Sequence, residues 1–331
     1  MTSPLPEDLH GRLAARAREA LAHFAASDPV LIKYRENAVF RVNLAEGGRA
    51  VLRLHRPGYH QEQALVSELD WLTGLHDAGL AVPRPLPART GQRLVRLPPN
   101  DVFPEHFADS MSWMEGTPLG ESGVPLARPP AEQARLFHAI GATMASLHEA
   151  ADRWRPPDHF VRPHWNAEGL IGDRPLWGRF WDCEGLRHTD AERLAALRGR
   201  LAAGLRDAAA AGLDYGLIHA DLVRENILVT RAGVGFIDFD DGGYGYRLFD
   251  IATALLKNRN EPAYADIEAA LIAGYRSRRP LDEDALARLP LFLVLRSLTY
   301  IGWLAARPES ADAGPRMRRS VAQSLALAEA L

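Results

Sequence analysis

The sequence predicts an α+β protein with two lobes: a small N-terminal lobe with an antiparallel sheet plus a helix, and a larger, mostly helical C-terminal lobe. Strand-like runs on either side of Glu46-Gly47-Gly48 indicate an antiparallel hairpin. Beyond residue 130, long segments carry apolar side chains at helical spacing. Between these regions, Gly116 to Pro130 is rich in glycine and proline, which makes it the best candidate for the lobe boundary.

The elements of the N-terminal lobe follow from its hydrophobic pattern. Apolar residues from Leu9 to Phe24 form one helical stripe, and Asp28-Pro29 is expected to end that helix. Alternating residues predict the hairpin strands, and a second helical stripe and two short strands follow. The expected elements are a helix over 7–26, strands over 39–44 and 50–54, a helix over 61–78, and strands over 94–97 and 111–114.

The C-terminal lobe is predicted to be mainly helical. The apolar stretch 289–306 is interrupted by Arg296, Ser297 and Thr299, so it predicts a buried helix rather than a membrane span. The other expected elements are helices over 131–151 and 189–211, a strand-rich motif region over 213–238, and helix from 261 to the C-terminus. The resulting domain limits are 1–27 for an N-terminal helix, 28–115 for the N-lobe and hinge, and 116–331 for the C-lobe.

Composition places the chain among soluble globular proteins. Its 331 residues can bury a large core, and 47% are apolar and 24% charged. A net charge of −3 argues against a nucleic-acid partner, which needs dense Lys and Arg. Cys183 is the one cysteine, so no intrachain disulfide can form and a reducing cytoplasm fits best. The stretch Met1 to Asp8 does not resemble a signal peptide, and we expect no membrane partner.

The most informative residues lie in the motif region. His219, Asp221 and Asn226 stand at H-x-D-x-x-x-x-N spacing, and a short hydrophobic strand then ends at Asp238. Phosphoryl transfer needs one carboxylate to accept the hydroxyl proton, and an amide and a second carboxylate to hold Mg²⁺ on the triphosphate. The pattern therefore predicts Asp221 as the catalytic base, and Asn226 and Asp238 as oxygen ligands of Mg²⁺.

Each of these residues also has a structural explanation. Asp221 can cap a turn, Asn226 can be a turn residue, and Asp238 can cap a strand end. These structural roles do not explain why the three residues occur together at this spacing. Compound motifs rarely recur by chance, so we favour the catalytic interpretation. His219 is expected to brace the loop by hydrogen bonds rather than to react.

A candidate phosphate-binding pair lies upstream. Arg53 on a strand and Glu68 on the next helix have the order of the cation and carboxylate that support the α/β-phosphates in kinases. A guanidinium can bind phosphate in place of the usual lysine; an exposed surface ion pair is the alternative. The turn from Tyr34 to Phe40, with Asn37, can place N–H groups near phosphate. No G-x-x-x-x-G-K-[ST] or G-x-G-x-x-G occurs, which excludes a P-loop NTPase and an ordinary Rossmann site.

With these motifs the chain resembles the superfamily of aminoglycoside phosphotransferases, choline kinases and type II homoserine kinases, in particular its bacterial stress-response-kinase-like branch. The resemblance covers nearly the whole chain from about Tyr34 onward and implies a bilobal protein-kinase-like fold with ATP and Mg²⁺ as cofactors. The shared motifs are E-N-x-V-[FY]-x-V at 36–42, h-h-R-h-H-R-P at 51–57, the H-x-D-x-x-x-x-N loop, I-D-F-D-D at 237–241 and F-D-h-A at 249–252.

The resemblance also implies roles for residues outside the catalytic loop. Asp250 matches a buried acid that braces this loop, and choline kinases likewise use Arg at the position of Arg53. Met111 to Glu115 matches the hinge, so the backbone of Met114 and Glu115 is expected to meet the adenine.

The acceptor site is expected in the stretch Phe160 to His188. Asp182 and Glu184, with Asp240 or Asp241, are expected to hold an ammonium group. Aromatic residues of the stretch could add cation–π contact. The alternative is that these aromatic side chains belong to the core and the acids are solvated. The aromatic residues are Trp165, Trp177, Phe180 and Trp181.

The sequence thus predicts an ATP- and Mg²⁺-dependent kinase acting on a hydroxyl of a small, amine-bearing molecule such as homoserine, a choline-like alcohol or an aminoglycoside. The alternatives are a Ser/Thr protein kinase of the stress-response type and a nucleotide-binding pseudokinase. Val223 stands where protein kinases carry a catalytic-loop lysine, and no A-P-E motif follows Asp238, which favours a small acceptor. We expect a monomer or homodimer.

Overall fold

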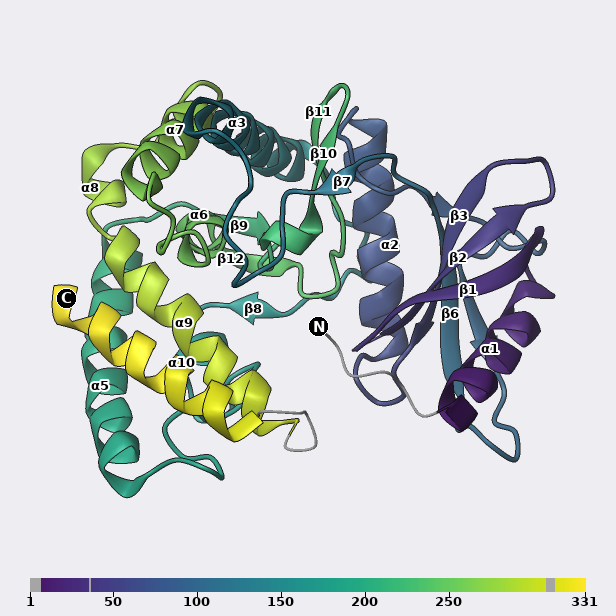
Figure 1. The fold of residues 1–331 in the computed structure, drawn as a ribbon, viewed down its shortest axis with the longest axis horizontal. Helices are drawn as coiled ribbons and strands as arrows, with labels where there is room; N and C mark the ends of the chain where they lie inside the picture. The colour runs from purple at the N-terminus through teal and green to yellow at the C-terminus, as the bar shows by residue number, and fades with distance from the viewer. Residues whose placement is uncertain (1–6, 36, 308–312) are drawn as a thin grey trace. The chain divides into compact units, whose positions relative to one another are not determined.

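The computed structural model describes residues 7–35, 37–307 and 313–331. The chain divides into two compact units, which are drawn in Figure 1. Unit 1 comprises the residues up to Glu115 together with Trp154–Arg162, and unit 2 comprises Gly116–Arg153 and Pro163–Leu331. The start of the predicted N-terminal helix domain, Glu36 of the predicted phosphate turn and part of the predicted C-terminal helical region lie outside the described residues.

Unit 1 is built on a six-stranded antiparallel sheet with strand order β1-β2-β3-β6-β4, and β5 pairs with β6. The predicted hairpin is confirmed, because β2 and β3 pair from Asn37↔His55 to Asn43↔Arg49. Its turn holds two glycines with φ of 91° and 88°, a conformation that glycine adopts without strain. The elements are β1 (Ala26–Tyr34), β2 (Asn37–Leu44), β3 (Arg49–His55), α2 (Glu62–Asp77), β4 (Pro85–Leu86), β5 (Leu94–Leu97) and β6 (His106–Ser112).

The N-terminal helix is shorter than the sequence predicts. α1 spans Glu7–Leu21, and Asp28 and Pro29 lie inside the edge strand β1. The register of β1 on β2 shifts between Ser27 and Val30, and Asp28 has a φ of 56°. A proline has no N–H for the ladder, so it is accommodated at a bulge on an edge strand. The prediction of a helix that continues to this proline is therefore wrong at its C-terminal end.

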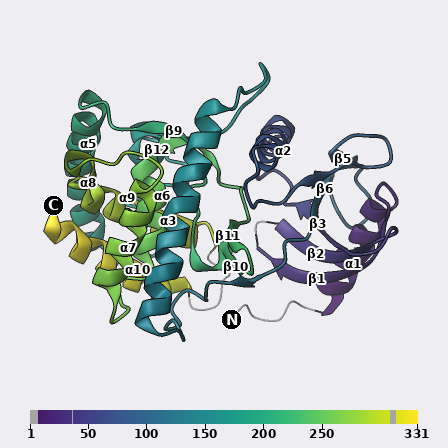
Figure 2. The same ribbon diagram turned by 90° about the horizontal axis from the view of Figure 1, so that it is seen from above.

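The two helices of unit 1 cover opposite faces of the sheet. Successive side chains of a strand point to opposite faces. Leu52 and Leu54 of β3 are buried in one cluster with Leu13 of α1. Arg53 lies between them in the strand and points to the other face, where it bonds to Glu68 of α2. Figures 1 and 2 show α1 and α2 on either side of the sheet.

The sixth strand is displaced from its predicted position. The sequence predicts a strand over 111–114, whereas β6 spans His106–Ser112. Asp109 and Ser110 in its centre are polar and buried, with 0% and 2% exposure. The apolar–polar alternation that marks a half-buried strand is therefore missing from this sequence. The strand predicted over 94–97 is confirmed as β5.

Unit 2 is mostly helical, which confirms the α+β class. The helices predicted over 131–151 and 189–211 correspond to α3 (Pro130–Arg153) and α5 (His188–Ala210). The remaining helices are α4 (Ala167–Ile171), α6 (Arg247–Leu256), α7 (Tyr264–Arg276), α8 (Glu283–Leu286), α9 (Leu289–Ala305), α10 (Ala313–Leu327) and the short η1 (Arg224–Asn226) and η2 (Ala328–Ala330).

Two glycines let α3 and α7 approach closely (Figure 2). A Cβ atom on Gly141 of α3 would lie 2.0 Å from the carbonyl oxygen of Leu271. A Cβ atom on Gly274 of α7 would lie 1.9 Å from the carbonyl oxygen of His138. No side chain fits at either position, so the close packing of these two helices requires glycine in both.

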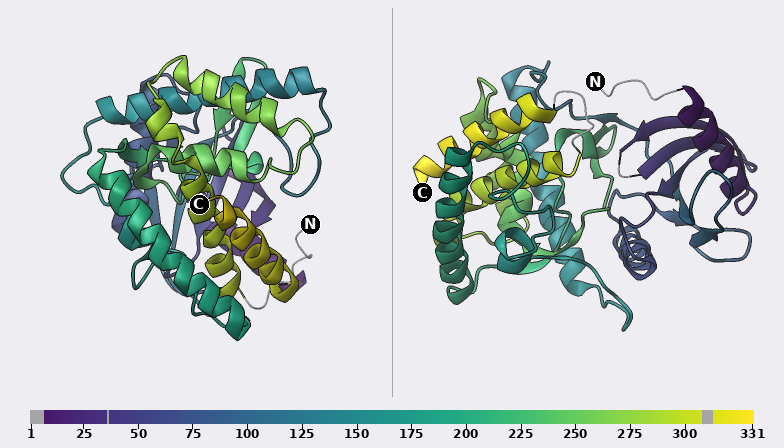
Figure 3. Two further views of the ribbon diagram at one scale, coloured as in Figure 1. Left: turned by 90° about the vertical axis from the view of Figure 1, so that its left-hand side faces the viewer. Right: turned by 90° about the horizontal axis from the view of Figure 1, so that it is seen from below.

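The apolar helix α9 is buried, as the sequence predicts. In the part of the chain that the structure describes, one helical stretch, Glu283–Ala305, is long and apolar enough to cross a membrane. However, 67% of its most apolar window is buried inside the protein, which is typical of a core helix. α9 contacts α5 and α10, and Figure 3 shows these helices side by side.

Two small sheets position the motif region within unit 2. In the first, β8 (His164–Trp165), β12 (Gly243–Tyr246) and β9 (Tyr215–Ile218) lie side by side. β9 runs directly into the loop that carries the predicted base. In the second, β7 (Thr117–Pro118) pairs with β10 (Ile227–Thr230), and β10 forms an antiparallel hairpin with β11 (Gly233–Phe236). This hairpin returns the chain from η1 to the acidic residues after β11.

Candidate active site

A buried acid on α6 holds the loop that follows β9. The carboxylate of Asp250 accepts hydrogen bonds from the backbone N–H groups of His219 and Ala220 at 2.9 and 2.7 Å. Burial would raise the pKa of Asp250, but hydrogen bonding to His148 and other contacts lower it overall. Burial lowers the pKa of His148 to about 4, so its neutral ring donates to Asp250 and accepts from the hydroxyl of Tyr275. A fixed negative charge thus orders the loop backbone.

The His219 ring ties the two halves of the motif together. Its Nε2 lies 3.0 Å from the carbonyl oxygen of Ile237, the residue before Asp238. Its Nδ1 accepts the backbone N–H of Asp221 at 3.3 Å. The backbone N–H of Ile237 also donates to the carbonyl of Asn226 at 3.0 Å. These contacts hold the predicted base and both predicted metal ligands in one local structure.

Both carboxylate oxygens of Asp221 are held by hydrogen bonds. Nη2 of Arg296 donates to Oδ1 at 2.5 Å, and Nδ2 of Asn226 donates to Oδ2 at 2.8 Å. The Asp221 side chain is still 26% exposed, so a proton donor can reach it. In the sequence, Arg296 stands out only as an interruption of an apolar helix. A charge buried among apolar residues needs a partner, and that was the available signal.

The residues present fit a divalent cation. The Asn226 amide nitrogen donates both to the carbonyl oxygen of Asp221, at 2.9 Å, and to its Oδ2, which leaves the amide oxygen for a cation. Asp238, with a φ of 69°, supplies a carboxylate shortly after β11. Mg²⁺ takes one or two protein oxygens and completes its shell with phosphate and water. Among the described residues, no group of three or more His, Cys, Asp or Glu side chains could hold a metal ion.

Two further acids follow the predicted metal ligand. Asp240 is buried, with 6% exposure, and the backbone carbonyl of Asp241 accepts the indole N–H of Trp165 at 2.9 Å. Burial, together with the charges of Asp221 and Asp240, raises the pKa of Asp241 well above its ordinary value. Several carboxylates therefore share one region, an arrangement that favours binding of a positively charged group.

In unit 1, Arg53 is the centre of a buried ion cluster. Its Nη1 donates to Glu68 at 2.8 Å, and its Nε and Nη2 donate to the two oxygens of Asp109 at 2.9 and 2.7 Å. His55 bonds to Asp109 at 2.7 Å. The surface-pair alternative is thereby excluded for Arg53 and Glu68, whose side chains are 7% and 0% exposed. Asp109 was missed, because its pairing with Arg53 depends on the contact between β3 and β6.

Replacing Asp109 with asparagine is expected to lower the free energy of unfolding by about 3 kcal/mol at pH 7, because Arg53 then loses a buried partner. Burial would raise the pKa of Asp109, but Arg53 and His55 lower it to about 2. This stabilisation is full above the unfolded-state pKa of about 3.9 and is lost as the pH falls through the folded-state value. Urea unfolding of both proteins from pH 7 to pH 3 measures the difference, which should shrink at the acid end.

The exposed Asp101, in the loop before β6, provides the matched control. Asp101→Asn should leave the unfolding midpoint unchanged across this pH range. An Asp109→Asn protein as stable as the wild type at pH 7 would contradict the assignment.

The other predicted nucleotide-binding residues lie at strand ends of unit 1. Asn37 opens β2 with 7% exposure, and its Oδ1 has no hydrogen-bond partner among the described residues. Met114 and Glu115 follow β6, and the exposed Glu115 carboxylate pairs with Arg49 at 2.6 Å. Their roles stay predictions.

The predicted acceptor stretch divides into buried rings and exposed acids. Trp165 and Phe180 are buried, each with 2% exposure. Asp182 has 68% side-chain exposure and pairs with Arg179 at 3.3 Å, and Glu184 is exposed. Two rings therefore belong to the core, whereas the role of the acids in acceptor binding stays a prediction.

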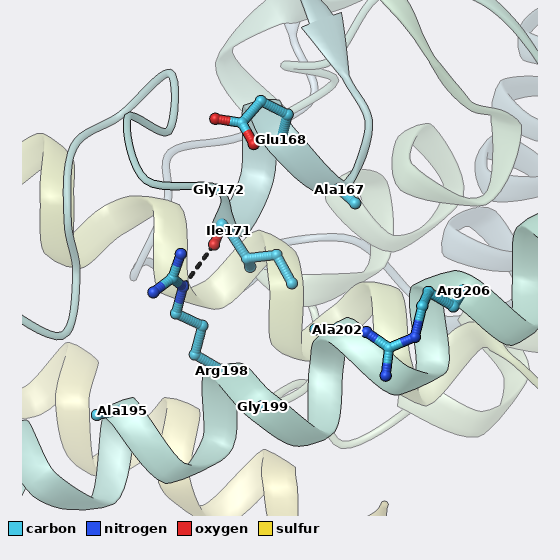
Figure 4. Close-up of a pocket in the computed structure, with 9 residues that line it drawn as sticks. All are labelled: Ala167, Glu168, Ile171, Gly172, Ala195, Arg198, Gly199, Ala202 and Arg206. Atoms are coloured by element: carbon cyan, nitrogen blue, oxygen red, sulfur yellow. Dashed lines mark hydrogen bonds between the residues drawn. The ribbon is translucent and has the colours of Figure 1, made fainter.

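A surface cavity of about 420 Å³ is lined by residues of α4 and α5 (Figure 4). Glu168, Arg198 and Arg206 line it together with alanine and glycine residues. Nε of Arg198 donates to the carbonyl oxygen of Ile171 at 2.6 Å, and the guanidinium stacks on Trp181 at 4.0 Å. None of the predicted site residues lines this cavity, so it carries no part of the phosphoryl-transfer chemistry.

Comparison with known proteins shows the family to which the chain belongs. The sequence profile of the phosphotransferase enzyme family matches residues 31–281. The chain belongs to this family. It is 30% identical over 282 residues to a homoserine kinase of Methylobacterium radiotolerans, a match that covers 82% of this chain and 79% of the relative.

Solved structures agree with this membership. The structure of a microcompartment-associated aminopropanol kinase has a TM-score of 0.80 and 34% identity, with 96% of each chain covered. The amicoumacin kinase hAmiN, solved with AMP-PNP, Ca²⁺ and Ami, has a TM-score of 0.77 and 20% identity over 96% of each chain. The chain thus has the predicted protein-kinase-like fold. This phosphotransferase is an ATP-dependent kinase that phosphorylates a hydroxyl group and acts on a small molecule.

Proposed function

We propose that this kinase uses ATP with Mg²⁺ in the cytoplasm to phosphorylate the hydroxyl of a small amino alcohol or hydroxy amino acid. The observation that carries the proposal is the hydrogen bond between Asn226 and Asp221 in unit 2, with Asp238 directly after Ile237, whose backbone bonds to Asn226. The Asn226 amide bonds to the base through its nitrogen and leaves its oxygen for a cation. An asparagine that served only as a turn residue would not need this orientation.

Each residue has a distinct part in the proposed reaction. Asp221 accepts the proton of the acceptor hydroxyl, which activates the oxygen for attack on the γ-phosphorus. When bound, Mg²⁺ neutralises charge on the phosphate oxygens, and Asn226 and Asp238 would hold it. Arg53 and Glu68 are proposed to support the phosphates, and Asn37 to approach them. The backbone of Met114 and Glu115 is proposed to meet the adenine.

The acceptor class is proposed from the names of relatives and from the charge of the site. Homoserine and aminopropanol each carry an amine and a hydroxyl, and related kinases bear these names. The acids Asp240 and Asp241 support binding of an ammonium group, because Asp240 is buried and Asp241 lies near the charges of Asp221 and Asp240, and clustered carboxylates favour a cationic partner.

A screen of ADP release tests the proposal. The screen compares small acceptors: ethanolamine, 1-amino-2-propanol, 3-amino-1-propanol, homoserine, choline and an aminoglycoside. A denatured protein mixture with labelled ATP serves as the protein acceptor. Turnover of one small amine supports the proposal, whereas label on protein would favour the protein-kinase alternative. ATP binding without any turnover would favour the pseudokinase alternative.

Replacing Asp182 and Glu184 together with alanine is expected to raise the KM for the amine acceptor by roughly tenfold, because each of the two lost charge contacts is worth about 0.7 kcal/mol. The KM for ATP should not change. Glu192→Ala is the matched control, since Glu192, like Asp182, is an exposed acid that pairs with a side chain of its own segment, and it has 66% exposure. An unchanged acceptor KM in the double variant would assign ammonium binding to other residues.

A further inference from the structure

The guanidinium of Arg296 is fixed beside the predicted base. Arg296 lies in the middle of α9 with 5% exposure. Its Nη2 bonds to Oδ1 of Asp221 at 2.5 Å, and its Nη1 bonds to the hydroxyl of Thr299 at 2.6 Å. Its Cζ also lies 4.6 Å from the centre of the Tyr300 ring. Contacts from the loop after β9 and from α9 itself therefore fix the orientation of the Arg296 side chain.

The charge of Arg296 matches its surroundings. Burial alone would lower the pKa of Arg296, but Tyr300, Asp221 and Asp241 raise it overall. A second cation, the ammonium group of Lys257, contacts the Tyr300 ring at 3.7 Å. Arg296 rather than Lys257 thus lies in direct contact with the base.

The catalytic loop itself offers no cation at this position. Val223 occupies the place where protein kinases carry a lysine near their catalytic aspartate. The neighbouring Arg224 is 2% exposed and turns away, since it bonds to Glu261 at 2.5 Å and to Asn258 at 2.9 Å. The loop depends on another element for a positive charge next to Asp221.

We propose that Arg296 is the positioning residue of Asp221, and that α9 supplies through it the cation that the catalytic loop lacks at Val223. This inference rests on the proposed role of Asp221 as base. The guanidinium fixes the carboxylate orientation and offsets the repulsion between Asp221 and the other acids of the site. It thereby keeps the carboxylate aimed at the acceptor hydroxyl. A misplaced reacting group can cost about 100-fold in rate.

The test compares Arg296→Met, Arg296→Lys and the double variant Val223→Lys/Arg296→Met. We expect Arg296→Met to lower kcat about 100-fold while the KM for ATP stays within about threefold. Added guanidinium should raise the kcat of Arg296→Met at least tenfold. The lysine at position 223 in the double variant should also restore part of kcat. Arg307→Met is the control, because Arg307 is also a buried arginine, at 7% exposure, and stacks on Trp303.

The outcomes separate a positioning role from a structural one. Thermal unfolding identifies variants that do not fold. If Arg296→Met does not fold, the kcat values of Arg296→Lys and Arg296→Gln test the inference instead. If folded Arg296→Met keeps more than a third of kcat, the inference is wrong. It is equally wrong if kcat falls and neither guanidinium nor either lysine restores it. The turnover of the wild type in the acceptor screen is measured first. If the wild type turns over an acceptor and Arg296→Met is unaffected, this inference alone is refuted. If the wild type turns over no acceptor, the proposed function is refuted as well.

Discussion

Asp221→Asn is expected to lower kcat about 1,000-fold, within the range that general-base catalysis contributes. The asparagine has the size of the native side chain and can still accept from Arg296, but it cannot take up the hydroxyl proton. The loop backbone is held by Asp250 rather than by the Asp221 side chain, so the fold of the loop should persist. Steady-state ADP release gives kcat, and calorimetric titration with ATP gives the binding constant, which should change little.

The control for this variant is Asp207→Asn, because Asp207 lies on the exposed side of α5. It should keep wild-type kcat. An Asp221→Asn enzyme with wild-type turnover would contradict the proposed mechanism. Equal loss of ATP binding and turnover would instead assign Asp221 to nucleotide binding.

Asp238→Asn is expected to lower kcat on the order of 100-fold and to raise the Mg²⁺ concentration for half-maximal activity on the order of tenfold, since a neutral amide is a weaker ligand. Asparagine is the suitable replacement, because Asp238 has a φ of 69° and asparagine tolerates that conformation. The change therefore removes charge without forcing the backbone to move. Titrations of activity with Mg²⁺ at saturating ATP measure both effects.

Asp28→Asn is the matched control for Asp238→Asn. Asp28 also has a positive φ, of 56°, but it lies in the exposed edge strand β1. Its replacement should leave the Mg²⁺ dependence unchanged. If Asp238→Asn needs no more Mg²⁺ than the wild type, Asp238 is not a ligand, whatever its effect on kcat.

The proximity of the motif residues could be predicted because their geometry is local. His219, Asp221 and Asn226 follow one strand, and the β10–β11 hairpin brings Asp238 back to them. Hydrogen bonds from His219 to Ile237 and from Asn226 to Asp221 join residues that are 18 and 5 positions apart. Turn residues, strand alternation and motif spacing contain this information.

The errors in the predicted fold also have physical reasons. Asp28 and Pro29 predicted a helix end, but a bulge on an edge strand accommodates a proline equally well. In β6, the buried Asp109 removes the apolar pattern that identifies a strand. A buried carboxylate is stable only with partners from other elements, and no window of sequence around it shows those partners.

By itself the sequence determined which residue types stand at the spacing that phosphoryl transfer needs, and where most of the helices and strands lie. The tertiary structure decided which charges meet. Arg53 bonds to Asp109 across 56 positions, and Arg296 bonds to Asp221 across 75 positions. Such contacts arise when strands pair and helices pack against one another. Local patterns do not contain these contacts, because the two partners of each contact lie on separate elements that are far apart in the sequence.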